Sequence, residues 1–173
     1  MRICFIRHGD NVNDKLTRLG KLQAKLICSD LHYENICKIY CSPKQRTRDT
    51  AKIIGRHLNI KDIEIRDEIT ERQQLRNTNS ENPDTIRYNE NYLTYTYSSK
   101  DPEGCKEFCD RIFKFLDRVI AEHLPQNENI VIVGHSSMAY VLNAYFTGIP
   151  KDNRLIWIRL GNCSKLCYEI NEN

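Results

Sequence analysis

The sequence predicts a single three-layer α/β/α domain with a mostly parallel central sheet. Short apolar runs of strand character alternate with segments whose apolar residues recur at helical spacing, which is typical of parallel sheets covered by helices on both faces. Residues 129–133 (NIVIV) are the most hydrophobic run, so we expect this strand at the centre of the sheet. The 173 residues contain no repeat, linker or internal boundary, and we predict one domain over residues 1–173.

The other elements follow from local patterns. Further strands are expected at residues 2–6, 38–41, 62–66, 155–160 and 165–170, and later helices at residues 107–123 and 137–146. The first helix is expected to begin after an N-cap at Thr17. Its predicted apolar face consists of Leu19, Leu22, Leu26 and Ile27. The second helix is expected to have Ser42 as its N-cap and Pro43 as its first residue.

The segment 73–104 differs from the rest of the chain. It is polar, rich in Asn, Ser and Tyr, and shows no sustained period. Loops of this length are usually either functional or disordered. We therefore treat residues 73–104 as a candidate substrate lid or insertion, with a mobile surface excursion as the alternative.

Composition excludes several classes of protein. The net charge is only +3, from 26 basic and 23 acidic residues, so there is no basic stripe of the kind that binds nucleic acid. No apolar run is long enough to span a membrane, and the first strand is too short for a signal sequence, which favours a cytoplasmic protein. The eight cysteines lack zinc-knuckle spacing, so we expect buried thiols, no metal site and no disulfide framework. Nothing in the sequence decides the oligomeric state.

The candidate site lies where the strands end. In parallel sheets, ligands bind outside the carboxyl ends of the strands. The first strand ends at Arg7-His8-Gly9, the second precedes Arg46, and the central strand ends at Gly134-His135-Ser136. A cluster of carboxylates follows the third strand, at Asp67, Glu68 and Glu71. Two of five histidines, two arginines and a carboxylate therefore share one edge of the sheet.

This set of residue types suits phosphoryl transfer. A neutral imidazole can attack phosphorus and divide one difficult displacement into two easier ones. Guanidinium groups and a second imidazole can hold the negative oxygens of the transferred group. A carboxylic acid can protonate the leaving oxygen and later activate water.

Five ordered motifs resemble the histidine phosphatase superfamily, which includes phosphoglycerate mutases and many small-molecule phosphatases. They span most of the chain outside residues 73–104. The motifs are Arg7-His8-Gly9, Leu16-Thr17-x-x-Gly20-x-x-Gln23-Ala24, Ser42-Pro43-x-x-Arg46-Thr47-x-x-Thr50-Ala51, Ile69-Thr70-Glu71-Arg72 and Ile130 to His135, followed by Asn162-Cys163.

The resemblance assigns roles to these residues. It implies that His8 is the nucleophile, that Arg7, Arg46 and His135 bind the phosphoryl group, and that Glu71 is the proton donor. Asp67, Glu68 and Asp10 stay open as rival donors. Asn11 falls where family members often have a phosphate-contacting Ser or Thr, and the amide of Ser136 can donate to phosphate.

Two positions depart from the family pattern. Ser136 stands where the family usually has glycine after the second histidine. Asp14 stands where the family often has an asparagine, and a carboxylate there would repel phosphate. A register shift that places Asn13 at this point is the alternative.

Three functions fit the sequence, and the first is favoured. It is a metal-independent phosphomonoesterase that needs no cofactor and hydrolyses a small phosphorylated metabolite through a phosphohistidine. The second is a phosphoglycerate mutase, but the chain lacks the adjacent arginine pair and reads Glu71-Arg-Gln-Gln-Leu75 where mutases show E-R-x-x-G. The third is a non-catalytic module that binds a phosphorylated ligand, which would need neither nucleophile nor acid.

Overall fold

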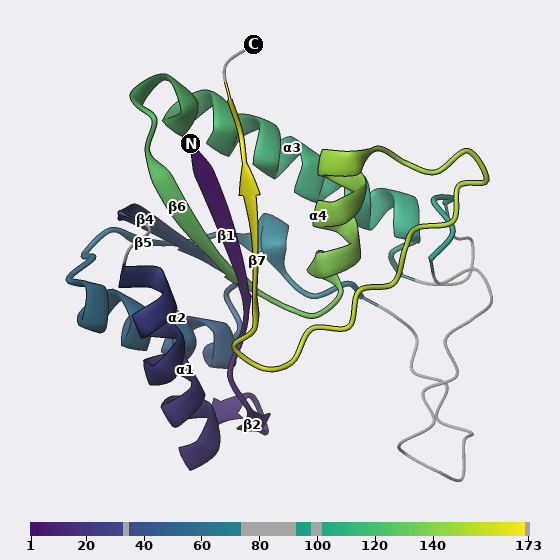
Figure 1. Ribbon diagram of the computed structural model, residues 1–173. Helices are drawn as coiled ribbons and strands as arrows, with labels where there is room; N and C mark the ends of the chain where they lie inside the picture. The colour runs from purple at the N-terminus through teal and green to yellow at the C-terminus, as the bar shows by residue number, and fades with distance from the viewer. Residues whose placement is uncertain (33–34, 74–92, 98–101, 172–173) are drawn as a thin grey trace, which may run out of the picture.

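In the computed structural model a central sheet separates two layers of helices (Figure 1). The structure describes residues 1–32, 35–73, 93–97 and 102–171. The predicted fold class, a three-layer α/β/α domain with a mostly parallel sheet, is confirmed. Most of the candidate lid, residues 74–92 and 98–101, lies outside the described residues, so its role stays a prediction.

The strands and helices alternate as the sequence predicts. The strands are β1 (Arg2–Arg7), β2 (Asn11–Val12), β3 (Lys15–Leu16), β4 (Ile36–Cys41), β5 (Ile63–Ile65), β6 (Asn129–Gly134) and β7 (Lys165–Glu169). The helices are α1 (Arg18–Leu31), α2 (Gln45–Leu58), α3 (Cys105–His123) and α4 (Met138–Thr147), with short 3-10 turns η2 (Asp67–Ile69) and η3 (Leu124–Gln126). Among the described residues, no helix is both long and apolar enough to cross a bilayer.

The order of the five-stranded sheet places the candidate site. The strands run β5-β4-β6-β1-β7, with β6 in the middle as expected from its unbroken apolar sequence. In this sheet β5, β4, β6 and β1 run parallel to one another, and β7 pairs antiparallel with β1. The carboxyl ends of β1, β4 and β6 therefore meet at one edge of the sheet.

Each face of the sheet has its own core. Ile3 and Phe5 of β1 point to the side covered by α3 and α4, and Cys4 and Ile6 point to the side covered by α1 and α2. All four side chains are fully buried, and their alternation follows the two-residue period of a strand. Both cores pack against β1 and β6, one on each face of the sheet, and this packing fixes the positions of the strand ends.

The predicted apolar face of α1 is largely wrong. Leu19, Leu22 and Leu26 are more than half exposed, and the buried face consists of Gly20, Ala24, Ile27, Cys28 and Leu31. Small residues face inward because the helix approaches the loop after β1 closely. A Cβ built on Gly20 would lie 2.0 Å from the carbonyl oxygen of Asp10.

The strand predicted at residues 155–160 is also wrong. Residues 155–160 form no strand ladder, and the nearest strand-like pairing is a single bridge between Thr94 and Arg154, just before this segment. Ile156 is 60% exposed and Trp157 stacks on Tyr140, with ring centroids 6.0 Å apart. The edge of β1 that such a strand would need is occupied by β7.

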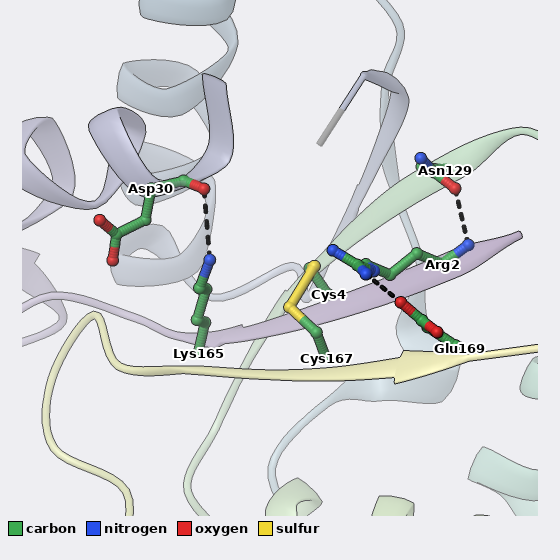
Figure 2. Close-up of a disulfide and its surroundings, with 7 residues drawn as sticks. All are labelled: Arg2, Cys4, Asp30, Asn129, Lys165, Cys167 and Glu169. Carbon is green, nitrogen blue, oxygen red and sulfur yellow. Dashed lines mark hydrogen bonds and ion pairs between the residues drawn. A yellow bond between two sulfur atoms is a disulfide. The ribbon is translucent and has the colours of Figure 1, made fainter. Parts of the chain in front are cut away.

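One cysteine pair contradicts the expectation of free thiols. Cys4 of β1 and Cys167 of β7 face each other in the antiparallel ladder, 4.2 Å apart between Cα atoms, and form a disulfide (Figure 2). The ion pair between Arg2 and Glu169 lies farther along the same two strands. Disulfides persist mainly in oxidising compartments, so the cytoplasmic location stays a prediction.

Candidate active site

The predicted site residues come together at the edge where β1, β4 and β6 end. His8 and His135 follow β1 and β6, with ring centroids 5.5 Å apart. Arg46, in the first turn of α2, reaches both rings. Glu71 enters from the segment after η2, close to His135. The convergence predicted from strand order alone is therefore found.

His8 is held with one ring nitrogen facing Arg46. Its Nδ1 lies 2.9 Å from the Gly9 carbonyl oxygen, which can only accept, so Nδ1 carries the proton. Nε2 then has its lone pair free and accepts a hydrogen bond from Arg46 Nε at 3.0 Å. Burial, together with the positive charges of Arg46 and Arg7, lowers the pKa of His8 to about 4. The ring is therefore a neutral imidazole at physiological pH.

Arg46 connects the two histidines. Its Nη2 donates to His135 Nδ1 at 3.0 Å, while its Nε donates to His8. The opposite nitrogen of His135, Nε2, must then carry the proton, and it donates to Ser42 Oγ at 2.8 Å. Burial and the Arg46 charge lower the pKa of His135 to about 2, so this ring is also neutral.

Ser42 is a site residue that the sequence prediction misplaced. It was expected to cap the second helix, but α2 begins at Gln45, with Lys44 at the N-cap position and no side-chain cap of its own. Instead, Ser42 accepts from His135 and fixes its tautomer. A serine directly before Pro43 fits both roles, so the sequence could not separate them.

Glu71 is the carboxylate that reaches the histidines. One of its oxygens lies 3.5 Å from His135 Nδ1, and the other accepts a short hydrogen bond from the Ser137 hydroxyl. Burial raises the pKa of Glu71, opposed by the Ser137 hydrogen bond and by Arg46 and Arg7. A raised pKa suits a group that must be protonated when it acts.

The rival carboxylates have other partners. Asp10 accepts from the Thr17 hydroxyl at 2.6 Å, and Glu68 pairs with Arg118. Asp67 opens η2, where its backbone carbonyl accepts from the amide of Thr70. Within the described residues, no hydrogen bond or ion pair joins any of these three carboxylates to His8, Arg46 or His135.

Among the described residues, the Arg7 guanidinium has a hydrogen-bond partner at one nitrogen and lacks one at another. Its Nη1 donates to the carbonyl oxygen of Leu160 at 2.7 Å. Its Nε is buried and has no hydrogen-bond partner within the described part of the chain. Burial lowers the pKa of Arg7 from its usual value, although Glu71 opposes this shift. A buried guanidinium nitrogen without a partner is costly unless an acceptor arrives.

Asp14 lies at the tip of the hairpin formed by β2 and β3. Asn13 and Asp14 both have positive φ, 48° and 64°, as the two-residue turn of such a hairpin requires. The Asp14 carboxylate accepts from the backbone amide of Gln45 at 3.0 Å and from Arg46 Nη1 at 2.7 Å. It is Asp14, and not Asn13, that faces Arg46. The side chain thereby caps α2 from outside and places a negative charge beside the candidate site.

The remaining motif residues hold the loop after β1. Its backbone amides at Gly9 and Asp10 donate to the side chains of Thr50 and Gln23, at 3.1 and 2.9 Å. Gly9 packs so closely on α1 that an added Cβ would lie 2.6 Å from the carbonyl oxygen of Gly20. Gly20 and Gln23 of the second motif and Thr50 of the third thus support the loop that follows β1.

The last two predicted residues are nearby but their roles are not decided. Asn11 Nδ2 lies 3.4 Å from His8 Nδ1, the nitrogen turned away from Arg46. Ser136 is half-buried in the turn before α4, where its carbonyl accepts from the amide of Ala139. Phosphate contacts of Asn11 and Ser136 therefore stay predictions. Ser137, which the sequence analysis did not select, contacts Glu71 directly.

Comparison with known proteins identifies the family. A family model described as "Histidine phosphatase superfamily (branch 1)" matches residues 3–173. The chain belongs to the histidine phosphatase superfamily. The resemblance inferred from the motifs is therefore confirmed across nearly the full sequence.

Two curated relatives of this superfamily member carry different functional names. A probable phosphoglycerate mutase of Yersinia enterocolitica is 26% identical, over 95% of this chain and 82% of its own length. A probable phosphatase of Schizosaccharomyces pombe is also 26% identical, over 84% of this chain and 73% of its own length.

Solved structures share the fold. A mycobacterial glucosyl-3-phosphoglycerate phosphatase superposes with a TM-score of 0.75 at 19% identity, covering 96% of this chain and 88% of that one. Bacillus stearothermophilus YhfR gives a TM-score of 0.75 at 20% identity, covering 98% of this chain and 91% of that one. An Entamoeba histolytica phosphoserine phosphatase gives 0.72 at 18% identity, with coverage of 98% and 91%.

Proposed function

We propose that this chain is a metal-independent phosphomonoesterase that hydrolyses a small phosphorylated metabolite through a covalent phosphohistidine on His8. The observation that carries the proposal is the arrangement around Arg46. One guanidinium contacts the lone pair of His8 Nε2 and His135 Nδ1 at 3.0 Å each. This arrangement supports a nucleophilic role for His8 and phosphate-binding roles for Arg46 and His135 at one phosphorus atom.

The surrounding groups would stabilise the transferred phosphoryl group. Arg46 would turn its donors from His8 toward the equatorial oxygens, where charge accumulates in the transition state. The buried Nε of Arg7 would gain the acceptor it lacks among the described residues. His135 is neutral, so it would donate to phosphate only after taking up a proton or changing its tautomer.

The reaction would proceed in two displacements. His8 Nε2 attacks phosphorus, the bond from phosphorus to the leaving oxygen breaks, and protonated Glu71 gives its proton to that oxygen. Glu71, now a carboxylate, takes a proton from a water molecule that attacks the phosphohistidine. The phosphorus–nitrogen bond breaks, phosphate leaves, and the electron pair returns to Nε2.

The decisive experiment traps the intermediate. Protein quenched during turnover of a radiolabelled phosphomonoester should carry base-stable, acid-labile label, and turnover should persist in EDTA. The His8→Ala variant should lose the label and at least about 10³-fold in turnover. The exposed His57→Gln variant is the matched control and should keep both. Wild-type turnover in His8→Ala would refute the covalent mechanism, and strict dependence on added metal would refute metal independence.

Glu71 is tested by the leaving group. Glu71→Gln should slow hydrolysis of alkyl phosphates more than that of p-nitrophenyl phosphate, because a good leaving group needs little protonation. Equal loss on both substrates would assign the proton transfer to another group.

The substrate is best sought with a panel of phosphorylated metabolites. The names of the relatives suggest phosphorylated glycerates and phosphoserine as first members of that panel. The mutase relative makes phosphoglycerate isomerisation the second function to assay. Isomerisation without net release of phosphate would replace the hydrolase proposal, and binding without either reaction would favour a non-catalytic module.

A further inference from the structure

A second cluster of reactive side chains lies at the opposite end of the sheet. Cys37, His123 and Glu128 each offer one metal-ligating atom, and these three atoms lie within 4.8 Å of one another. His123 ends α3, Glu128 directly precedes β6, and Cys37 is near the start of β4. The catalytic candidates follow β1, β4 and β6, so the two clusters are separated by the length of the strands (Figure 1).

The backbone brings this cluster together through two irregular features. The pairing of β4 with β6 slips between Ile36 and Lys38, so that Cys37 is the extra residue of a bulge. Bulges change the direction of a side chain and occur often beside functional sites. At the other feature, Asn127 adopts positive φ, and the Glu128 amide donates to the His123 carbonyl oxygen at 3.1 Å. This turn folds Glu128 back onto His123.

The histidine is oriented as a metal ligand would be. His123 is only 4% exposed, and its Nδ1 lies 2.7 Å from Glu128 Oε2. Its other nitrogen, Nε2, lies 2.8 Å from the hydroxyl of Tyr40. Metal-bound histidines almost always have their second nitrogen hydrogen-bonded in this way, which fixes the ring and its tautomer. The Tyr40 hydroxyl in turn donates to the carboxylate oxygen Oε2 of Glu122 at 3.4 Å.

The geometry points to a zinc site formed by Cys37 Sγ, His123 Nδ1 and Glu128 Oε2, with solvent as the fourth ligand. Thiolate, imidazole and carboxylate are the three ligand types that Zn²⁺ uses in proteins. Bonds of about 2.0–2.3 Å in a tetrahedron put ligand atoms roughly 3.3–3.8 Å apart. The His123 and Glu128 atoms, now 2.7 Å apart, would therefore separate by roughly 0.6 Å, and the Cys37 sulfur would approach them from at most 4.8 Å. Cys37 is exposed, which leaves the ion a path from solvent.

The charges in the cluster also suit a cation. Glu128 would contribute a negative ligand, and a divalent ion would bind Cys37 as its thiolate and displace the proton of the thiol. The ion would join α3, β4 and β6 at the end of the sheet away from His8. We therefore assign it a structural role that hydrolysis does not require.

The test measures zinc binding and the cobalt spectrum of the full chain after chelator treatment. Wild type should bind one tight equivalent of Zn²⁺, and Co²⁺ should give a thiolate charge-transfer band in the near ultraviolet. Cys37→Ser should abolish the band, and both Cys37→Ser and Glu128→Gln should weaken zinc binding by about a hundredfold or more. His57→Gln is the matched control at an exposed position and should bind as wild type.

The results of these zinc-binding measurements distinguish the proposed site from a zinc site elsewhere in the chain. No tight zinc in wild type, or wild-type binding and an unchanged cobalt band in Cys37→Ser, would overturn the assignment. Zinc lost from His8→Ala but kept in Cys37→Ser would locate the ion at the candidate active site and would also overturn it. Zinc should raise the thermal midpoint of wild type but not of Cys37→Ser. Phosphatase activity in EDTA tests the proposed function separately.

Discussion

The negative charge of Asp14 beside the candidate phosphate site should weaken anion binding, and Asp14→Asn should strengthen it. Asparagine has one acceptor oxygen in place of two, so it can keep the hydrogen bond from the Gln45 amide, which caps α2, and would give up the one from Arg46. Asparagine also tolerates the positive φ of 64° at this position. The substitution therefore removes one charge and one hydrogen bond to Arg46 while it keeps the cap of α2.

The expected gain in phosphate affinity can be worked out from the contacts that Asp14 and His8 both make with the Arg46 guanidinium. Asp14 Oδ1 and His8 Nε2 both contact Arg46, at 2.7 and 3.0 Å, so the carboxylate lies at most about 8 Å from the attacking nitrogen. Two unit charges at that separation repel by about 0.5 kcal/mol in bulk water and about 2 kcal/mol at an effective dielectric constant of 20. Asp14 is 38% exposed, so we take about 1 kcal/mol, or about fivefold in affinity.

Competitive inhibition by inorganic phosphate or vanadate measures this effect directly. The inhibition constant should fall about fivefold in Asp14→Asn, and the gain should shrink as salt is added because the carboxylate is partly exposed. Asp14→Ala is the control, since it removes the charge together with the helix cap and should cost about 1 kcal/mol of stability. Unchanged or weaker phosphate inhibition in a folded Asp14→Asn variant would refute the electrostatic reasoning.

Three further predictions test the fold around the site. In the folded state the pKa values of His8 and His135 are about 4 and about 2, below the unfolded value near 6.5. The free energy of unfolding should therefore fall as pH drops from about 6.5 toward 4. Urea titrations across this pH range should show a shallower fall for His8→Ala than for wild type. Gly20→Ala should lower both activity and the thermal midpoint, because the new Cβ would meet the Asp10 backbone, whereas Lys21→Ala on the exposed face should not. Reducing the Cys4–Cys167 disulfide, which closes a separation of 163 residues, should lower the unfolding free energy by about 3–5 kcal/mol, and Cys167→Ser should make reductant ineffective.

The arrangement of the sheet and the candidate site could be predicted because both follow from local patterns. The apolar run of β6 requires cover on both faces, which puts this strand in the centre. Parallel strands place their carboxyl ends together, which brings His8, Arg46 and His135 to one edge without any knowledge of side-chain contacts.

The errors arise where two patterns compete or where tertiary contacts decide. In α1, two sets of residues recur at helical spacing, and close packing of Gly20 on Gly9 turns the face with Gly20, Ala24 and Ile27 to the interior. Residues 155–160 (LIWIRL) form an apolar run like that of a buried strand, but β7 already occupies the free edge of β1. The disulfide and the proposed zinc ligands are brought together by register and by a bulge, so their spacing in sequence carries no signal.

The contacts around His8 explain why the motifs extend well beyond the groups that would touch phosphate. A neutral nucleophile needs its lone pair directed outward, and this requires that the proton on Nδ1 be held by the Gly9 carbonyl. That carbonyl is positioned by a loop whose amides bind Thr50 and Gln23 and whose backbone touches Gly20. A change at any of these residues would alter the direction of the His8 lone pair before it altered phosphate contacts. The support of the loop is therefore part of the chemistry that the motifs encode.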